Sequence, residues 1–141
     1  MVFCTKDPDG PGGYDLYYSE LVGEDEWSSP YLMPNTINTA GDEYFPTSCR
    51  DTLYFSSDYL PGLGGLDIFK THLKEDGSWA TPINLKQPIN SSYDDFGLVI
   101  DEYVKLRGKE LEKGFFSTSR GKNGDDDIYS YTRYELSLIH I

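Results

Sequence analysis

The chain has 141 residues, the length of one domain that can bury a hydrophobic core. Its 24 Asp and Glu residues against 12 Lys and Arg residues give a net charge of −12, which argues against binding to nucleic acid or an anionic membrane, because both need clustered cations. The 12 Tyr, 7 Phe, 14 Gly and 8 Pro predict an all-β chain with many short strands joined by tight turns.

The first residues, MVFCTKDPDG, predict a strand around Val2 and Phe3 and lack the basic and apolar regions of a signal peptide. No segment is apolar over the length needed to span a bilayer, so we expect no membrane insertion. Cys4 and Cys49 fit neither a zinc spacing nor a disulfide framework. Either a single bridge or two small core thiols remains open.

An internal repeat organises the chain. GGYDLYYSEL (12–21) aligns with GGLDIFKTHL (64–73) at an offset of 52, and the register continues without gaps to Tyr44 and Phe96. A third, partial copy follows, because GFFSTSRGKNGDDDIYSY (114–131) matches LYFSSDYLPGLGGLDIFK (53–70). Self-similarity at a fixed period is typical of repeat architectures. The copies span approximately 1–42, 43–94 and 95–134.

Each copy reads as four short strands with apolar residues on both faces. The Asp-Gly pair of DGSW (76–79) predicts the turn between the last two strands of the middle copy. A sheet covered on both faces is typical of a propeller blade, so we expect about two and a half four-stranded blades, as a fragment or an open arc. In the middle copy the strands are expected at 43–48, 52–57, 66–73 and 81–85.

The third copy departs from the pattern in two places. The segment 104–113, with Lys105 and Arg107, predicts a lengthened and locally basic hairpin. The last residues, 135–141, abandon the repeat and are expected to be a non-native or disordered tail.

Several conspicuous residues recur from copy to copy. An Asp in each copy can accept hydrogen bonds from loop N–H groups and hold the turn into the third strand, and the preceding glycines permit positive φ or close backbone approach. The tryptophans could stack on a sugar but more often anchor one sheet on the next. We therefore assign structural roles to Asp15, Asp67, Asp127, Gly13, Gly65, Trp27 and Trp79.

Two groups of charged residues are candidate sites. The run Asp125, Asp126 and Asp127 is the densest carboxylate cluster and the first place to look for calcium, although it lacks the spacing of a calcium loop. Residues that precede the innermost strands, or lie on the basic hairpin, are candidates for partner binding. They are Asp42, Glu43, Asp94, Asp95, Lys105 and Arg107.

The sequence offers no enzymatic motif. A glycosidase needs two carboxyl groups at a set separation, but the prominent Asp residues here belong to the repeat, whereas a catalytic residue should break it. There is no GxSxG elbow, phosphate loop or HExxH motif. We predict no catalytic residue and no cofactor.

The pattern YFSSD…GGLDIF…W…YDDFG, followed by GFFSTSRG…GDDDIYSY, resembles the WD-repeat-like propeller repeat of the TolB type. It is most similar to the propeller beside OmpA-like peptidoglycan-binding domains in envelope proteins of Bacteroidetes. The resemblance implies location in the bacterial envelope, in the periplasm or at the outer membrane. It also implies contact with other envelope proteins, and with peptidoglycan only through a domain absent here.

These observations lead to one functional expectation and one alternative. We expect a non-enzymatic protein-interaction or scaffold segment of a bacterial cell-envelope protein, whose parent carries an OmpA-like domain. The alternative is a glycan-binding or glycan-processing propeller of the envelope.

Overall fold

The computed structural model describes residues 1–135, which contain strands and turns but no helix. Those residues therefore include no helix that is long and apolar enough to cross a membrane. The prediction of an all-β chain is confirmed. The predicted tail lies outside the described residues except for Glu135, whose backbone N–H donates to the Lys109 carbonyl at 2.8 Å.

Residues 1–135 form three antiparallel sheets and one small hairpin. The first sheet has the order β1-β2-β5, formed by β1 (Val2–Lys6), β2 (Tyr14–Tyr18) and β5 (Tyr31–Leu32). The hairpin between β2 and β5 consists of β3 (Leu21–Gly23) and β4 (Glu26–Trp27).

The second sheet has four strands in the order β6-β7-β8-β9, formed by β6 (Glu43–Cys49), β7 (Thr52–Ser57), β8 (Asp67–His72) and β9 (Ile83–Asn84). The third sheet has the order β10-β11-β12, formed by β10 (Asp95–Ile100), β11 (Glu110–Thr118) and β12 (Asp127–Tyr134). The four strands expected in the middle copy are therefore present, the last of them shorter than expected.

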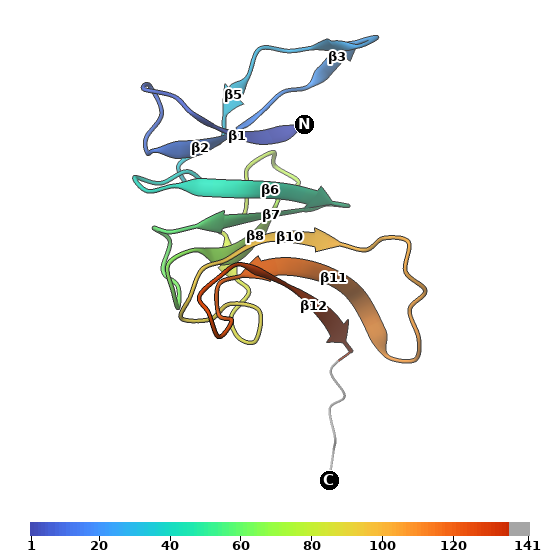
Figure 1. Cartoon of the computed structure of the whole chain (residues 1–141). Coiled ribbons are helices and arrows are strands. Elements are labelled where there is room, and N and C mark those ends of the chain that lie inside the picture. The colour runs from blue at the N-terminus through green and yellow to red at the C-terminus, as the bar shows by residue number, and fades with distance from the viewer. Residues whose placement is uncertain (136–141) are drawn as a thin grey trace.

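The sheets are stacked in chain order, with the β6–β9 sheet between the other two (Figure 1). Strand β7 accounts for this position, because its side chains are apolar or small on both faces. Leu53 and Phe55 are buried on one face and Tyr54 on the other. Burial on both faces is the reason its sequence does not alternate between apolar and polar residues.

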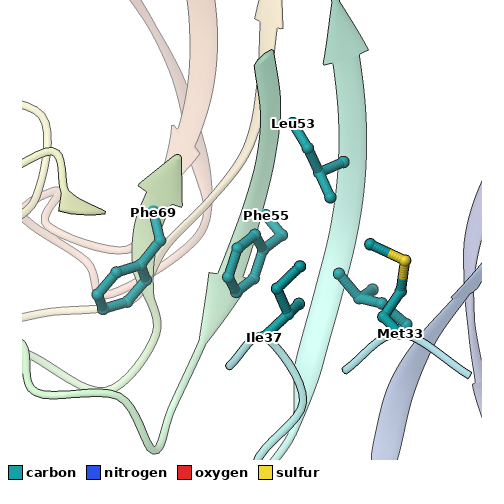
Figure 2. Close-up of a cluster of buried hydrophobic side chains, with 6 residues drawn as sticks. Met33, Ile37, Leu53, Phe55 and Phe69 are labelled. Atoms are coloured by element: carbon teal, nitrogen blue, oxygen red, sulfur yellow. The ribbon is translucent and has the colours of Figure 1, made fainter. Parts of the chain in front are cut away.

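The first hydrophobic core fills the space between the first and second sheets. Figure 2 shows Met33 and Ile37 pointing toward Leu53, Phe55 and Phe69. Leu16 belongs to the same cluster, and Val2, Cys4, Tyr18, Leu60 and Trp79 pack around it.

The second core joins the second and third sheets. Tyr54 and Ile68 contribute from one side, and Leu98 and Phe116 from the other. Tyr131 of β12 packs against this cluster, and its hydroxyl donates to Glu112 Oε1 at 2.9 Å. Both cores are formed from facing sheets, so neither outer sheet would be stable without the middle one.

Two connections show how local chemistry sets the turns. In the predicted Asp-Gly turn, Gly77 has φ of 84° and Asp76 Oδ1 accepts hydrogen bonds from the Ser78 N–H and hydroxyl. The segment 104–113, predicted as a lengthened hairpin, lies only in part in the connection between β10 and β11, because its last four residues, 110–113, begin β11. In this connection the Arg107 N–H donates to Glu110 Oε2 at 2.9 Å.

The two cysteines are free thiols, so no bridge joins them. Cys4 packs against the first core, and Cys49 borders the second. The Cys49 thiol donates to Glu102 Oε1 at 2.9 Å, and this hydrogen bond raises the pKa of Cys49.

Candidate partner-binding surface

A row of aromatic rings crosses the three sheets at one edge. Tyr14 at the start of β2 lies 5.0 Å from Tyr44, measured between ring centroids, and Tyr44 lies 5.7 Å from Phe45. Phe45 in turn stacks on Phe96 of β10 at 5.0 Å. We call these four side chains the aromatic ladder. Tyr14 and Phe45 are 38% and 45% exposed, so the ladder is accessible to a partner.

Phe45 occupies a backbone position that suits glycine. Its φ is 53°, and the residue 52 positions later, Gly97, has φ of 64°. Both lie at a bulge in the first strand of their sheet, between Tyr44 and Thr47 in β6 and between Phe96 and Val99 in β10. A bulky residue in this region costs about 1–3 kcal/mol and often marks a functional position.

Asp42 and Asp94 hold the loops beside the ladder. Asp42 Oδ1 accepts a hydrogen bond from the Tyr14 N–H at 2.7 Å, and Asp94 Oδ1 accepts from the Leu66 N–H at 2.8 Å. Asp94 is exposed and Asp42 half-buried.

The predicted glycines are explained by these carboxylates. A Cβ added at Gly13 would lie 2.2 Å from Asp42 Oδ1, and one at Gly65 would lie 2.2 Å from Asp94 Oδ1. Close backbone approach, rather than positive φ, is therefore the reason for glycine at both positions.

Glu43 and Asp95 do not belong to the exposed surface, and their prediction as partner-binding residues is wrong. Both are 0% exposed. Glu43 accepts hydrogen bonds from the Thr39 N–H and hydroxyl and from the Ser57 hydroxyl. Successive side chains along a strand point to opposite faces of its sheet, so only one residue of each acidic pair can face solvent.

The charge around the ladder is negative. Burial and then the nearby Asp42 carboxylate raise the pKa of Tyr44, so its hydroxyl stays protonated and can donate. Burial also raises the pKa of Glu43. Aromatic faces beside carboxylates suit a cationic group, which interacts with both the ring quadrupole and the acidic oxygens.

The recurring Asp residues each lie against a loop glycine. An added Cβ at Gly10 would lie 2.2 Å from Asp15 Oδ2, and one at Gly121 would lie 2.3 Å from Asp127 Oδ2. Asp15 and Asp67 are buried, and the Oδ1 atom of each has no hydrogen-bond partner, whereas Asp127 is exposed. Burial raises the pKa of Asp15. Asp15 Oδ2 accepts a hydrogen bond from the Gly12 N–H at 3.2 Å, and Asp67 Oδ2 accepts one from the Leu63 N–H. A structural role for Asp127 stays a prediction.

The remaining candidates lie away from the ladder. Asp125, Asp126 and Asp127 are exposed, and within residues 1–135 no group of three or more His, Cys, Asp or Glu side chains is placed to hold a metal ion. Lys105 and Arg107 are exposed in the connection 101–109.

The two tryptophans have different environments. Trp79 packs against the first core, where it joins the second sheet to the first. Trp27, 52 residues earlier, is 47% exposed.

Two buried amides were missed as key residues, although their alignment in the repeat was visible. Asn38 Oδ1 accepts from the Leu16 N–H at 2.7 Å, and its Nδ2 donates to the Leu16 carbonyl at 2.9 Å. Asn90 makes the same pair of hydrogen bonds to Ile68, both at 2.8 Å. Each side-chain amide makes the two backbone hydrogen bonds that a residue of a neighbouring strand would otherwise make to Leu16 or Ile68.

Comparisons with known proteins give little further identification. No family model matches the chain, and no solved structure matches it. A SET and MYND domain-containing protein from Dictyostelium discoideum is 32% identical over 100 residues. The match covers 71% of this chain but 7% of that protein, so the chain spans a small part of the relative's length.

This finding corrects the resemblance drawn from the sequence. The curated relative is a SET and MYND domain-containing protein, and no family model supports the TolB-type propeller repeat or the OmpA-family assignment. The motifs on which the resemblance depended are short Asp, Gly and aromatic patterns that stabilise turns and sheet contacts. Such patterns report local geometry and do not specify a family.

Proposed function

We propose that the chain is a non-enzymatic protein-interaction scaffold that binds a cationic segment of its partner at the aromatic ladder. The observation that carries this proposal is Phe45. It is exposed and occupies a left-handed backbone position where the next sheet has Gly97. A bulky residue in a strained backbone position whose side chain is nearly half exposed favours a use in binding.

The architecture that we propose for the scaffold is an arc of about two and a half propeller blades. The sheets of three, four and three strands, stacked in order, support this arrangement. The bulges at Phe45 and Gly97 and the amide contacts of Asn38 and Asn90 also fall at matching positions of adjacent sheets. In this arrangement the innermost strands are β6 and β10, so the ladder lies at their starting ends.

The chemistry of the ladder favours a protein segment with Arg or Lys side chains. The rings of Tyr14 and Phe45 are partly exposed to a cation, and Asp94, two residues before Phe96, offers an exposed carboxylate. The net charge of −12 would attract such a segment over a longer range. The non-enzymatic part of the proposal is supported by the internal hydrogen bonds that engage the prominent carboxylates.

The substitution Phe45→Gly tests the proposal without altering net charge. Removing the strained φ offsets the lost ring contacts, so we expect stability within about 1 kcal/mol of the parent. Binding of a synthetic peptide of alternating Arg and Gly should weaken about tenfold, as loss of a cation–π contact predicts. Peptide titration by calorimetry and urea unfolding measure the two effects.

Tyr103→Gly is the matched control, because Tyr103 is 98% exposed and lies outside the ladder. Equal peptide affinity for both variants and the parent would show that binding is non-specific attraction to the acidic body and would overturn the proposal. Binding of neutral oligosaccharides that depends on Phe45 would favour the glycan alternative instead.

Neither the aromatic ladder nor the fold bears on where the protein is located in the cell. Location in a bacterial envelope and contact with other envelope proteins were implied by the resemblance alone. They stay predictions, to be checked by fractionating cells that express the full-length parent.

A further inference from the structure

The connection between β11 and β12 contains an asparagine that is followed by glycine, Asn123 and Gly124 (Figure 1). The backbone nitrogen of the residue after an asparagine can attack the side-chain Cγ atom, and glycine presents no side chain that hinders this approach. The other four asparagines of the chain precede Thr, Leu or Ser; they are Asn35, Asn38, Asn84 and Asn90. Asn123 therefore has the least hindered neighbour of the five.

The structure leaves the Asn123 side chain able to react. Asn123 is exposed, and within residues 1–135 no hydrogen bond engages its side chain. Gly124 has φ of 71°, and a Cβ atom added to it would meet no atom within 4 Å. The space around Gly124 gives its nitrogen room to approach the Asn123 Cγ atom.

One hydrogen bond opposes this approach. The Gly124 N–H donates to the Gly121 carbonyl at 3.1 Å and closes a β-turn over residues 121–124. Residues 122–124 are exposed. A single exposed hydrogen bond in a loop opens in local fluctuations that leave the rest of the fold intact. The turn should therefore slow the attack without preventing it.

Two aspartates also precede glycine, but their surroundings disfavour the same ring closure. Asp76 Oδ1 accepts hydrogen bonds from the Ser78 N–H and hydroxyl, which lower the pKa of Asp76 and keep it ionised. An ionised carboxylate is a poorer electrophile than an amide. Gly10, which follows Asp9, packs so closely that an added Cβ atom would lie 2.2 Å from Asp15 Oδ2.

The other asparagines are held by hydrogen bonds or shielded by the next residue. Asn38 and Asn90 are buried, and the amide of each is bonded to the backbone of a neighbouring strand. Asn84 Oδ1 accepts from Asn90 Nδ2 at 2.9 Å. Asn35 is exposed, but the β-branched side chain of Thr36 crowds the nitrogen that would attack it.

We propose that Asn123 is a site of spontaneous deamidation. The Gly124 nitrogen loses its proton to base and attacks Asn123 Cγ. A bond forms between this nitrogen and Cγ, the bond between Cγ and Nδ2 breaks, and ammonia leaves. The product is a five-membered succinimide ring. Water then opens the ring at either carbonyl, which gives aspartate or isoaspartate at position 123 without an oxidant, a cofactor or an enzyme.

Both products change the turn. Each adds one negative charge beside the run 125–127, where all three residues are aspartate. Isoaspartate also routes the main chain through Cγ and lengthens it, so the hydrogen bond from the Gly124 N–H to the Gly121 carbonyl is lost. Asp127 pairs with Thr118 where β12 begins, and we expect faster amide exchange at this end of the hairpin.

Incubation of the full chain at mildly alkaline pH, followed by peptide mapping with mass spectrometry, measures the modification at each asparagine. Conversion at Asn123 should be on the order of tenfold or more faster than at any other asparagine. Its rate should rise with pH, because the Gly124 nitrogen must lose a proton. Chromatography of the modified peptide should separate two products, aspartate and isoaspartate.

Asn123→Gln is the matched control. It keeps an amide at this position, but the longer side chain would have to close a less favourable six-membered ring, so conversion should fall on the order of tenfold or more. Circular dichroism of this variant should match the parent, since the residue is exposed. A free peptide with the sequence of residues 121–127 shows that the chosen conditions suffice for the reaction.

Three results would overturn the inference: an unchanged Asn123 under conditions that convert the free peptide, equal conversion at the other asparagines, or aspartate as the sole product, which indicates direct hydrolysis. The inference does not rest on the aromatic ladder. Phe45→Gly should deamidate at Asn123 like the parent, and Asn123→Gln should bind the Arg-Gly peptide like the parent.

Discussion

The third sheet differs from the second in how its buried carboxylate is satisfied, because in the third sheet the cation of Arg120 binds it. Its Nη2 lies 2.6 Å from Asp95 Oδ1, and its Nε donates to Thr118 Oγ1 at 2.9 Å. The guanidinium also donates to the carbonyls of Pro88 and Ile89 and lies over the Phe116 ring, 5.4 Å from its centroid. In the second sheet, Glu43 is satisfied by hydroxyl and N–H donors without a cation.

The substitution Arg120→Ala should destabilise the chain by about 3 kcal/mol, because it leaves the buried Asp95 carboxylate without its cation. Urea unfolding at neutral pH measures this loss. Arg133→Ala is the matched control, since Arg133 is 56% exposed and its pair with Glu112 is 3.5 Å long. Exposed pairs contribute about 0–1 kcal/mol, so equal losses in the two variants would contradict the assignment.

For single residues, the sequence predicted which side chains recur from copy to copy better than it predicted whether each side chain is buried or exposed. The roles of Gly13 and Gly65 in close packing follow from an Asp at a fixed distance along the chain. The burial of Glu43 could not be read from adjacent acidic residues, because a one-residue change of register moves a side chain to the other face of a strand. The strain at Phe45 could have been suspected from its alignment with Gly97.

The buried amides of Asn38 and Asn90 act at the scale of the strand. Strands β5 and β9 have two residues each and cannot satisfy the whole outer edge of β2 or β8. Each amide supplies a donor and an acceptor to one residue of the neighbouring strand, Leu16 or Ile68. The loop between two sheets is thereby tied to the sheet that it leaves.

Replacing Asn90 with Ala should expose the Ile68 amide to exchange and lower stability by about 1–3 kcal/mol, because it leaves the Ile68 N–H unsatisfied, whereas the Ile68 carbonyl keeps its bond from the Leu85 N–H. Hydrogen exchange measures the effect by residue. Asn38→Ala should affect Leu16 and leave Ile68 protected, and the exposed Asn123 offers a neutral control for Ala substitution. Uniform loss of protection across the sheets in either variant would argue against a local role.

The sequence predicted which segments form strands better than it predicted how long each strand is. The β6, β7 and β8 strands agree with the segments expected from aromatic and β-branched residues. Strand β9 is shorter than the expected 81–85, because Asn84 turns inward to contact Asn90 and Asp67. Short-range patterns indicate which residues favour a strand, but long-range hydrogen bonds decide where an outer strand ends.

For the whole molecule, buried carboxylates connect pH with stability. Burial raises the pKa of Asp15 from its ordinary 3.8 and that of Glu43 from its ordinary 4.5. Below those values both groups are protonated in either state, and the fold bears no cost from them. As pH rises through the raised pKa values, the unfolded chain releases protons more readily than the folded chain, so stability is lost.

The Asp15→Asn variant should therefore gain stability relative to the parent as pH rises from about 4 toward neutrality. Its free energy of unfolding in urea, measured against the parent at each pH, gives the difference directly. Asp76→Asn provides a control of opposite sign, because hydrogen bonds from Ser78 lower the pKa of Asp76 and favour its charged form. A parent–variant difference that does not change with pH for Asp15→Asn would show that the folded chain does not disfavour the Asp15 carboxylate.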